Sequence, residues 1–211
     1  MIIQPLMAMK IKLSLLLLLF FSIPLFSQTN DFGLWGTIAL EKKWNKQYSF
    51  SYTQEVRFFD NATRIDKTFS EVKINYRINK YFNTSLGYRF SVCFDDLELQ
   101  TYLKHRFYWD GNIRYKINNW RINYRTRFVQ EFERMQSSTN GIIPKYVNRN
   151  KIQCTYNIPN NPFSIAVSEE IYYLFHSFGE EGFNKNRNAL SINYKLNTIQ
   201  EIGVFYMIEQ R

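Results

Sequence analysis

The chain has 211 residues, of which 18% are aromatic, and 27 Lys and Arg against 18 Asp and Glu give a formal net charge of +9. Basic residues interleaved with aromatic ones suit a nucleic-acid groove, but the exported N-terminus described next argues against that class. Two cysteines, Cys93 and Cys154, are too few for a disulfide-rich scaffold.

The first 27 residues have the pattern of a secretory signal peptide. Lys10 and Lys12 precede an apolar run from Leu13 to Phe26, and the small residue Ser27 follows it. A basic region, a short apolar region and a small residue are typical of such a peptide. The run is too short for a comfortable transmembrane helix. We therefore expect export of the chain, one domain over residues 28–211, and no nucleic-acid partner.

Alternation of apolar and polar residues predicts strands through the whole of that domain. The clearest case is WRINYRTRFVQEFER (120–134), with apolar residues at most even positions and charged residues at most odd ones. Because successive side chains of a strand point to opposite sides, this pattern gives one apolar and one charged face. About ten strands follow from it, over residues 32–41, 48–58, 71–78, 82–92, 106–117, 120–133, 152–158, 163–173, 190–196 and 202–208.

The connections between these strands alternate in length. Short polar turns lie at WNKQ (44–47), INKY (78–81), KINNW (116–120), NIPNNP (157–162) and KLNTIQ (195–200). Longer connections are expected at 59–67, 94–100, 133–146 and 176–187. The short turns carry the Asn and Pro typical of hairpins. The pattern predicts a meander of hairpins, with short turns on one rim and longer loops on the other.

Two all-β architectures fit a meander of this kind. A soluble barrel or sandwich buries its apolar face, whereas a membrane barrel turns that face to lipid and its charged face to a polar interior. Strands of ten or more residues suit a tilted crossing of a bilayer. Aromatic residues such as Tyr48, Phe82, Trp120 and Phe163 open the apolar faces, as in membrane interface belts. We favour an antiparallel up-and-down transmembrane β-barrel of about 10–12 strands, with a soluble secreted binding protein as the alternative.

Several strand motifs also resemble a known family. These are WxxxxLEKKW (35–44), QEVRFFDN (54–61), LGYRF (86–90), HRFYWD (105–110) and WRINYRTRF (120–128). Together they are similar to the domain of unknown function family DUF2490, uncharacterised outer-membrane β-barrel proteins of Gram-negative bacteria. The resemblance implies an outer-membrane location, with outer-membrane lipid and the barrel assembly machinery as partners. It implies no activity.

Two features depart from the pattern of such barrels. The chain stops at MIEQR rather than at a terminal aromatic residue, so we expect the closing strand to be missing or the sequence to be truncated. If the N-terminus starts in the periplasm, the first short turn lands outside and the long loops inside, contrary to the usual arrangement. A first segment threaded through the lumen, or an additional strand, would remove this conflict.

The charged faces supply the candidate functional residues. If these faces line an interior, the lumen residues are Glu55, Arg57, Glu71, Lys73, Arg77, Arg89, Arg106, Asp110, Arg114, Arg121, Arg125, Arg127 and Glu131. Their excess of cations favours a passage that attracts anions. The alternative is a narrow barrel whose arginines and carboxylates interlock as ion pairs and fill it.

An enzyme that modifies lipids is the second functional alternative. The only histidines are His105, on the apolar face, and His176, which is followed by Ser177, Glu180 and Glu181. No GxSxG elbow or nucleotide motif accompanies them. The acidic run DDLELQ (95–100) lacks the spacing and glycine of a calcium loop. We expect no cofactor, no metal and no enzymatic turnover, and we expect Cys93 and Cys154 to lie on opposite faces as free thiols.

Overall fold

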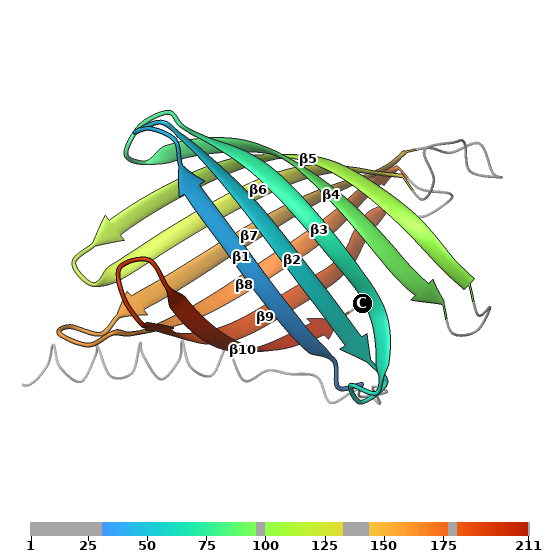
Figure 1. The fold of residues 1–211 in the computed structure, drawn as a ribbon. Coiled ribbons are helices and arrows are strands. Elements are labelled where there is room, and N and C mark those ends of the chain that lie inside the picture. Colours follow the sequence, from blue (N-terminus) through green and yellow to red (C-terminus); the bar gives the residue numbers. More distant parts are fainter. Residues whose placement is uncertain (1–30, 96–99, 133–143, 177–180, 211) are drawn as a thin grey trace, which may run out of the picture. The chain divides into compact units, whose positions relative to one another are not determined.

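The computed structural model describes residues 31–95, 100–132, 144–176 and 181–210, and for residues 95, 100 and 176 it describes the backbone only. The unit Gly33–Arg211 carries ten strands, each hydrogen-bonded to its neighbours in sequence order. The strands are β1 (Leu34–Lys43), β2 (Tyr48–Phe59), β3 (Arg64–Arg77), β4 (Phe82–Asp95), β5 (Gln100–Ile117), β6 (Trp120–Phe132), β7 (Lys145–Asn157), β8 (Phe163–His176), β9 (Gly182–Lys195) and β10 (Glu201–Gln210). They curl round an interior as a half-barrel (Figure 1), which confirms the predicted all-β up-and-down barrel fold.

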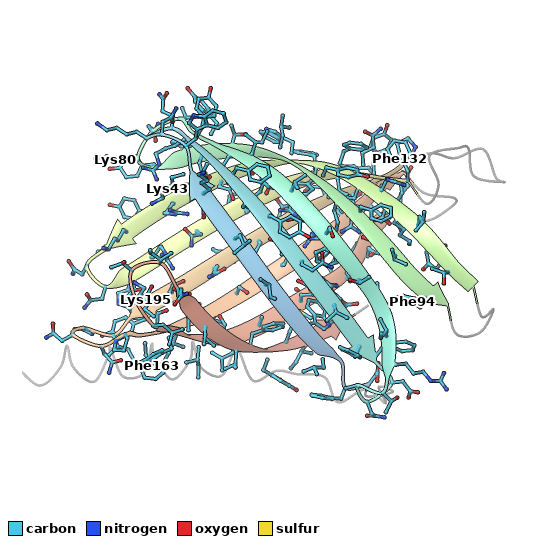
Figure 2. The ribbon with its side chains drawn as sticks, in the orientation of Figure 1. Lys43, Lys80, Phe94, Phe132, Phe163 and Lys195 are labelled. Carbon is cyan, nitrogen blue, oxygen red and sulfur yellow. The ribbon has the colours of Figure 1, made fainter. Side chains whose placement is uncertain are left out.

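The connections between successive strands lie alternately at the two ends of this half-barrel. The turns 44–47, 78–81, 118–119, 158–162 and 196–200 lie at one end, here called the turn end. The starts of β1 and β3, and the ends of β4 and β10, lie at the other, here called the loop end. Figure 2 places Lys43, Lys80 and Lys195 at the turn end and Phe94 and Phe132 at the loop end. The connections therefore alternate between the two ends, but the predicted difference in length is wrong for three of the four at the loop end. Between β2 and β3, β4 and β5, and β8 and β9 there are four, four and five residues, as in the short turns, and only the connection from β6 to β7 is longer.

Asparagine side chains fix four of the five short turns. Asn45 Oδ1 accepts hydrogen bonds from the backbone N–H groups of Gln47 and Tyr48, at 2.8 and 2.7 Å. Asn79, Asn161 and Asn197 accept equivalent bonds from residues two or three positions later. Asn and Asp stabilise turns in this way because their short side chains reach the backbone just ahead of them.

The strands extend further toward the loop end than the alternation predicts. β3 begins at Arg64 rather than at residue 71, and β9 begins at Gly182 rather than at residue 190. The predicted connections 59–67 and 176–187 are wrong to that extent. Register shifts between Arg57 and Phe58, and between Tyr172 and Tyr173, change which residues face inward. Such bulges break the two-residue period on which the prediction depended.

The two faces of the sheet differ sharply in burial. The buried side chains lie on the inner face, and they include the apolar core residues Phe69, Cys93, Tyr108, Val129, Ala166, Tyr172 and Leu174. On the outer face large apolar side chains stay exposed: Leu86 keeps 65% of its surface accessible and Ile74 keeps 57%. Monomeric soluble proteins rarely expose continuous apolar surface on this scale. The outer face therefore needs an apolar environment or a partner.

Aromatic side chains of the outer face gather near both ends of the strands. At the turn end they pair across neighbouring strands, as in Trp120 with Tyr156, whose ring centroids lie 4.7 Å apart. Further pairs at this end are Tyr48 with Tyr76, Tyr81 with Tyr115 and Phe163 with Tyr194. Toward the loop end a second group contains Tyr88, Phe107, Phe132, Phe128 and Phe175. Between the two groups the outer face carries aliphatic residues such as Ile74 and Leu86, with the aromatic residues Trp109 and Tyr124 among them.

The edges of the sheet are β1 and β10. Over the described residues no backbone pairing joins these two strands. Side chains nevertheless meet across the seam, where the rings of Trp35 and Phe205 lie edge to face with centroids 5.8 Å apart. The guanidinium of Arg57 stacks on Trp35 at 3.5 Å from the ring centroid. The expectation that a closing strand is missing stays a prediction. Within the described ranges, no helix has the length and hydrophobicity to cross a membrane.

Candidate functional site

The thirteen charged residues singled out by the sequence all lie on one face of the strands β2 to β6. Strand pairing fixes this placement, since it sets Glu71 beside Arg89, Arg89 beside Arg106, and Arg106 beside Glu131. This face is the inner one, because Glu71, Asp110 and Arg127 on it are buried. The structure therefore places these side chains on one face of the sheet, and their role in lining a lumen stays a prediction.

A row of four charges crosses β3 to β6 in the order acid, base, base, acid. The Arg89 guanidinium contacts the Glu71 carboxylate at 2.5 Å, and Arg106 pairs with Glu131. The central residues Arg89 and Arg106 are direct cross-strand neighbours. Like charges placed directly opposite destabilise a sheet. Each arginine is compensated by its own glutamate, so the row as a whole is neutral.

The most buried ion pair joins Asp110 of β5 to Arg127 of β6. Arg127 Nε and Nη2 donate to the two carboxylate oxygens of Asp110, at 2.6 and 2.8 Å, and the residues are only 4% and 2% exposed. Ser85 Oγ donates to the same carboxylate at 3.3 Å. Two parallel bonds between a guanidinium and a carboxylate form the strongest and most directional kind of ion pair. This pair fixes β4, β5 and β6 relative to one another.

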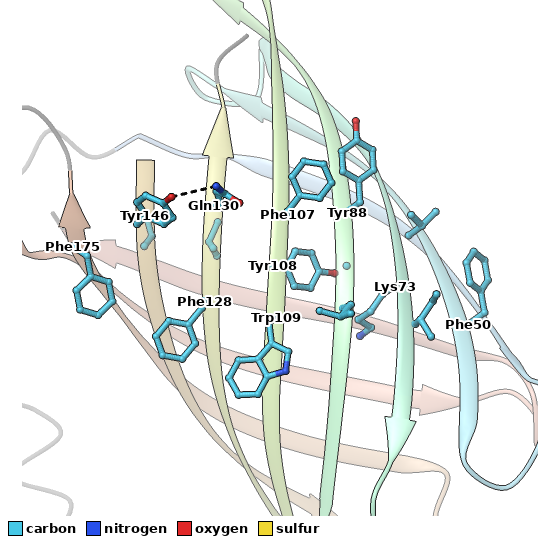
Figure 3. A pocket seen from close by; sticks show the side chains of 16 residues that line it. Phe50, Lys73, Tyr88, Phe107, Tyr108, Trp109, Phe128, Gln130, Tyr146 and Phe175 are labelled. Atoms are coloured by element: carbon cyan, nitrogen blue, oxygen red, sulfur yellow. Dashed lines mark hydrogen bonds between the residues drawn. The ribbon is translucent and has the colours of Figure 1, made fainter. Parts of the chain in front are cut away.

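Tyr108 occupies the middle of the inner face because its neighbour is a glycine. The Arg127 guanidinium lies 3.7 Å from the centre of the Tyr108 ring. On β4, Gly87 is the cross-strand partner of Tyr108, and a Cβ at this position would lie 2.1 Å from Tyr108 Cζ. Figure 3 shows the tyrosine ring directed at this strand. Outer-face rings, among them Trp109 and Phe128, surround an apolar hollow of about 570 Å³ at the same place.

Further inner-face residues complete the ion-pair network, and the sequence analysis did not single them out. Glu170 of β8 accepts bonds from Arg125 at 2.5 Å and from Arg149 at 2.9 Å. Tyr172 donates to Glu170 and accepts from Arg187. The additional members are Arg149, Glu170, Tyr172, Arg187 and Glu209. The alternation placed Ile171 on the apolar face. Because neighbours in a strand point to opposite sides, it could have placed Glu170 on the inner face.

Arginines in the central and loop-end part of the inner face all pair with carboxylates. The pairs are Arg57 with Glu55, Arg89 with Glu71, Arg106 with Glu131, Arg127 with Asp110, Arg125 and Arg149 with Glu170, and Arg187 with Glu209. Arginines and carboxylates therefore interlock in this part of the inner face, and a filled interior stays a prediction.

The turn end of the inner face has a different balance of charge. Among the described residues, no ion pair involves Lys73, Arg77, Arg114 or Arg121. Three of these four residues line a polar cavity of about 860 Å³, together with Asn75, Asn83 and Asn112. The charged residues around this cavity are Lys43, Lys46, Lys73, Arg77, Arg114 and Glu41. The cavity is therefore basic, with one carboxylate among its lining residues.

The histidines that were candidates for lipid chemistry form no catalytic group within the described residues. His105 lies on the outer face, where its Nδ1 is 2.7 Å from the Tyr88 hydroxyl. The side chain of His176 and residues 177–180 lie outside the described part of the chain, as do residues 96–99 of the acidic run. Within the described residues no cluster of metal ligands occurs.

The two cysteines lie on opposite faces of the sheet. Cys93 is buried on the inner face, and Cys154 pairs with Ile122 and Val167 of the outer face; both are free thiols.

Comparison with known proteins identifies the family. The family model described as protein of unknown function, DUF2490, matches residues 32–211. The chain belongs to the DUF2490 family. This confirms the resemblance found in the strand motifs. No curated protein matches this DUF2490 chain.

Two solved structures are similar to this DUF2490 member. One is the NanC porin in a rhombohedral crystal form, with a TM-score of 0.53 and 14% identity over 84% of this chain and 85% of that one. The other comes from work on in-meso crystallization of membrane proteins, with a TM-score of 0.41 and 15% identity over 87% of this chain and 73% of that one. At this identity the NanC similarity shows a porin-like β-barrel fold and nothing about substrate.

Proposed function

We propose that this DUF2490 protein is an outer-membrane β-barrel whose inner face bounds a narrow passage. The observation that carries the proposal is the contrast between the faces: a continuous apolar outer face with aromatic groups near both ends, and an inner face of charged side chains. Transmembrane barrels have this distribution, since lipid meets the outer side chains and water or polar groups meet the inner ones.

Strand length supports a membrane location. The strands contain 10 to 18 residues, as in β1 (Leu34–Lys43) and β5 (Gln100–Ile117). A tilted strand needs about 9–11 residues to cross the hydrocarbon core. Lipid contact also removes the penalty of exposing the outer apolar side chains to water, about 25 cal/mol per Å². We propose export through the segment 1–27, with outer-membrane lipid and the barrel assembly machinery of a Gram-negative cell as partners.

The polar cavity at the turn end favours a passage. Its lining is basic, and a cleft with charge of one sign concentrates solutes of the opposite sign. We propose that the paired arginines toward the loop end form a constriction, where Asp110 with Arg127 is the most buried of the described ion pairs. We propose selective movement of small anions past this constriction, without enzymatic turnover.

A structural barrel with a filled interior is the second candidate. The carboxylate contacts of Arg57, Arg89, Arg106, Arg125, Arg127, Arg149 and Arg187 favour it. Buried charge that is paired and hydrogen-bonded serves to hold strands together as well as to line a pore. Ion-current measurements, described at the end of the Discussion, separate the two candidates.

Cell fractionation tests the membrane assignment. We expect the mature protein to pellet with the outer membrane, to resist carbonate extraction, and to change its gel mobility when a detergent sample is heated. Compact barrels keep their fold in detergent until they are heated, which causes the mobility change. Recovery from the soluble periplasm, with one gel mobility before and after heating, would refute the proposal.

A further inference from the structure

We propose that the turn end of the inner face holds a binding site for a small solute with two or more anionic oxygen groups, carboxylate or phosphate. Lys73 and Arg77 of β3 and Arg114 of β5 line the polar cavity described above, and Arg121 of β6, which is not among the lining residues, adds a fourth cation near Arg114. The inference rests on the proposed function, since it specifies which solute the passage holds.

The first argument is the missing counter-charge. Deeper arginines on the same face each contact a carboxylate of the protein, as described above. In the described part of the chain Arg77, Arg114 and Arg121 have no such contact. Arg114 Nε donates to the neutral Asn123 Oδ1, at 3.2 Å. Guanidinium groups bind carboxylate and phosphate through two parallel donors. These three groups are therefore available for anions from solution.

The second argument is mutual repulsion among the cations. The largest electrostatic influences on Arg114 from other side chains are repulsion by Arg121 and by Arg77, followed by attraction to Glu41. Arg121 is also the direct cross-strand neighbour of Lys116, and like charges in that position destabilise a sheet. An anion bound between these residues would offset the repulsion among the basic side chains at the turn end.

The third argument is an unsatisfied donor. Arg121 Nε is buried, and it has no hydrogen-bond partner among the described residues. Most buried polar atoms in folded proteins are hydrogen-bonded, so an exception requires an explanation. A bound oxyanion provides the acceptor for Arg121 while its second anionic group reaches Arg114 or Arg77.

The cavity itself sets the size of the solute. Its volume of about 860 Å³ falls within the range of about 300–1,000 Å³ of pockets that hold small organic ligands. Amides of Asn75, Asn83 and Asn112 add neutral donors and acceptors to the lining. Because the three arginines come from three strands, a solute with one anionic group engages one of them well, and a solute with two or three engages several.

Calorimetric titration of the purified, heat-modifiable protein in detergent tests the site, with citrate and pyrophosphate as probes and acetate as the monovalent comparison. We expect citrate or pyrophosphate to bind at least about tenfold more tightly than acetate, because several charge-assisted hydrogen bonds act together. Arg114→Gln should weaken that binding about tenfold or more. Glu41→Gln should strengthen it, since Glu41 is the carboxylate in the cavity lining. Preference for one probe identifies the anionic group.

The matched control is Arg64→Gln, which removes the same charge at the loop end, where Arg64 pairs with Asp60 at 3.4 Å. Absence of citrate and pyrophosphate binding to folded wild-type protein overturns the inference, as does equal weakening by Arg64→Gln and Arg114→Gln. The titration needs no membrane and no current. Anion binding without ion conductance would therefore support the binding site and contradict the proposed passage. Conductance without anion binding would support the passage and contradict the binding site.

Discussion

At the residue scale, the Asp110–Arg127 pair is the contact that the inner face depends on most. Its two hydrogen bonds are almost fully shielded from water. Removal of one partner from a buried pair leaves an uncompensated charge and costs about 3–5 kcal/mol, whereas replacement of both partners by apolar side chains is often neutral. The burial of the pair, rather than its charge alone, makes its contribution to the free energy of unfolding large.

We therefore expect Asp110→Asn to lower the free energy of unfolding by about 3–5 kcal/mol, measured by urea titration of the detergent-solubilised protein. The double variant Asp110→Leu with Arg127→Met should lose less than this. The control is Asp60→Asn, because Asp60 is exposed and its pair with Arg64 is a surface one, worth at most about 1 kcal/mol. Equal losses for Asp110→Asn and Asp60→Asn would contradict the assigned importance of the buried pair.

At the element scale, the pairing of β4 with β5 depends on the absence of a side chain at Gly87. A Cβ at this position would overlap the Tyr108 ring, at 2.1 to 2.5 Å from its atoms. Overpacking of a tightly filled position costs about 1–3 kcal/mol. Gly87→Ala should therefore reduce the fraction of protein that shows heat-modifiable mobility. Gly36→Ala serves as the control, since a Cβ there meets Val56 at an ordinary 3.4 Å, and it should fold like wild type. Wild-type folding of Gly87→Ala would refute this packing argument.

How much of each strand could be predicted depends on whether one face stays apolar. In β6 (Trp120–Phe132) the alternation holds over most of the strand, and its start agrees with the structure. In β9 (Gly182–Lys195) residues 184–188 are all polar, so no period marks the strand, although β8 supplies its hydrogen-bond ladder. Contacts between strands distant in sequence were equally hidden. Glu170 reaches Arg125 across 45 residues, and nothing local indicates that pairing.

At the scale of the whole molecule, the faces of the half-barrel were predictable and the use of its interior was not. Alternation assigned the thirteen charged residues to one face, because a period of two fixes the side of every residue in an unbroken strand. On that face some arginines pair with carboxylates and others, at the turn end, do not. The register of neighbouring strands decides which arginines meet a carboxylate. Glu71 meets Arg89, for example, while Arg121 meets Lys116. Alternation along one strand does not fix these registers.

Ion current across a planar lipid bilayer tests the proposed passage most directly. We expect heat-modifiable wild-type protein to give discrete conductance steps, with a reversal potential in a KCl gradient that shows preference for chloride, because the turn-end cavity is basic. Arg114→Gln should reduce this preference, and Arg64→Gln should leave it unchanged. An electrically silent bilayer that contains folded protein, or steps that prefer potassium, would contradict the passage and leave a filled, structural barrel.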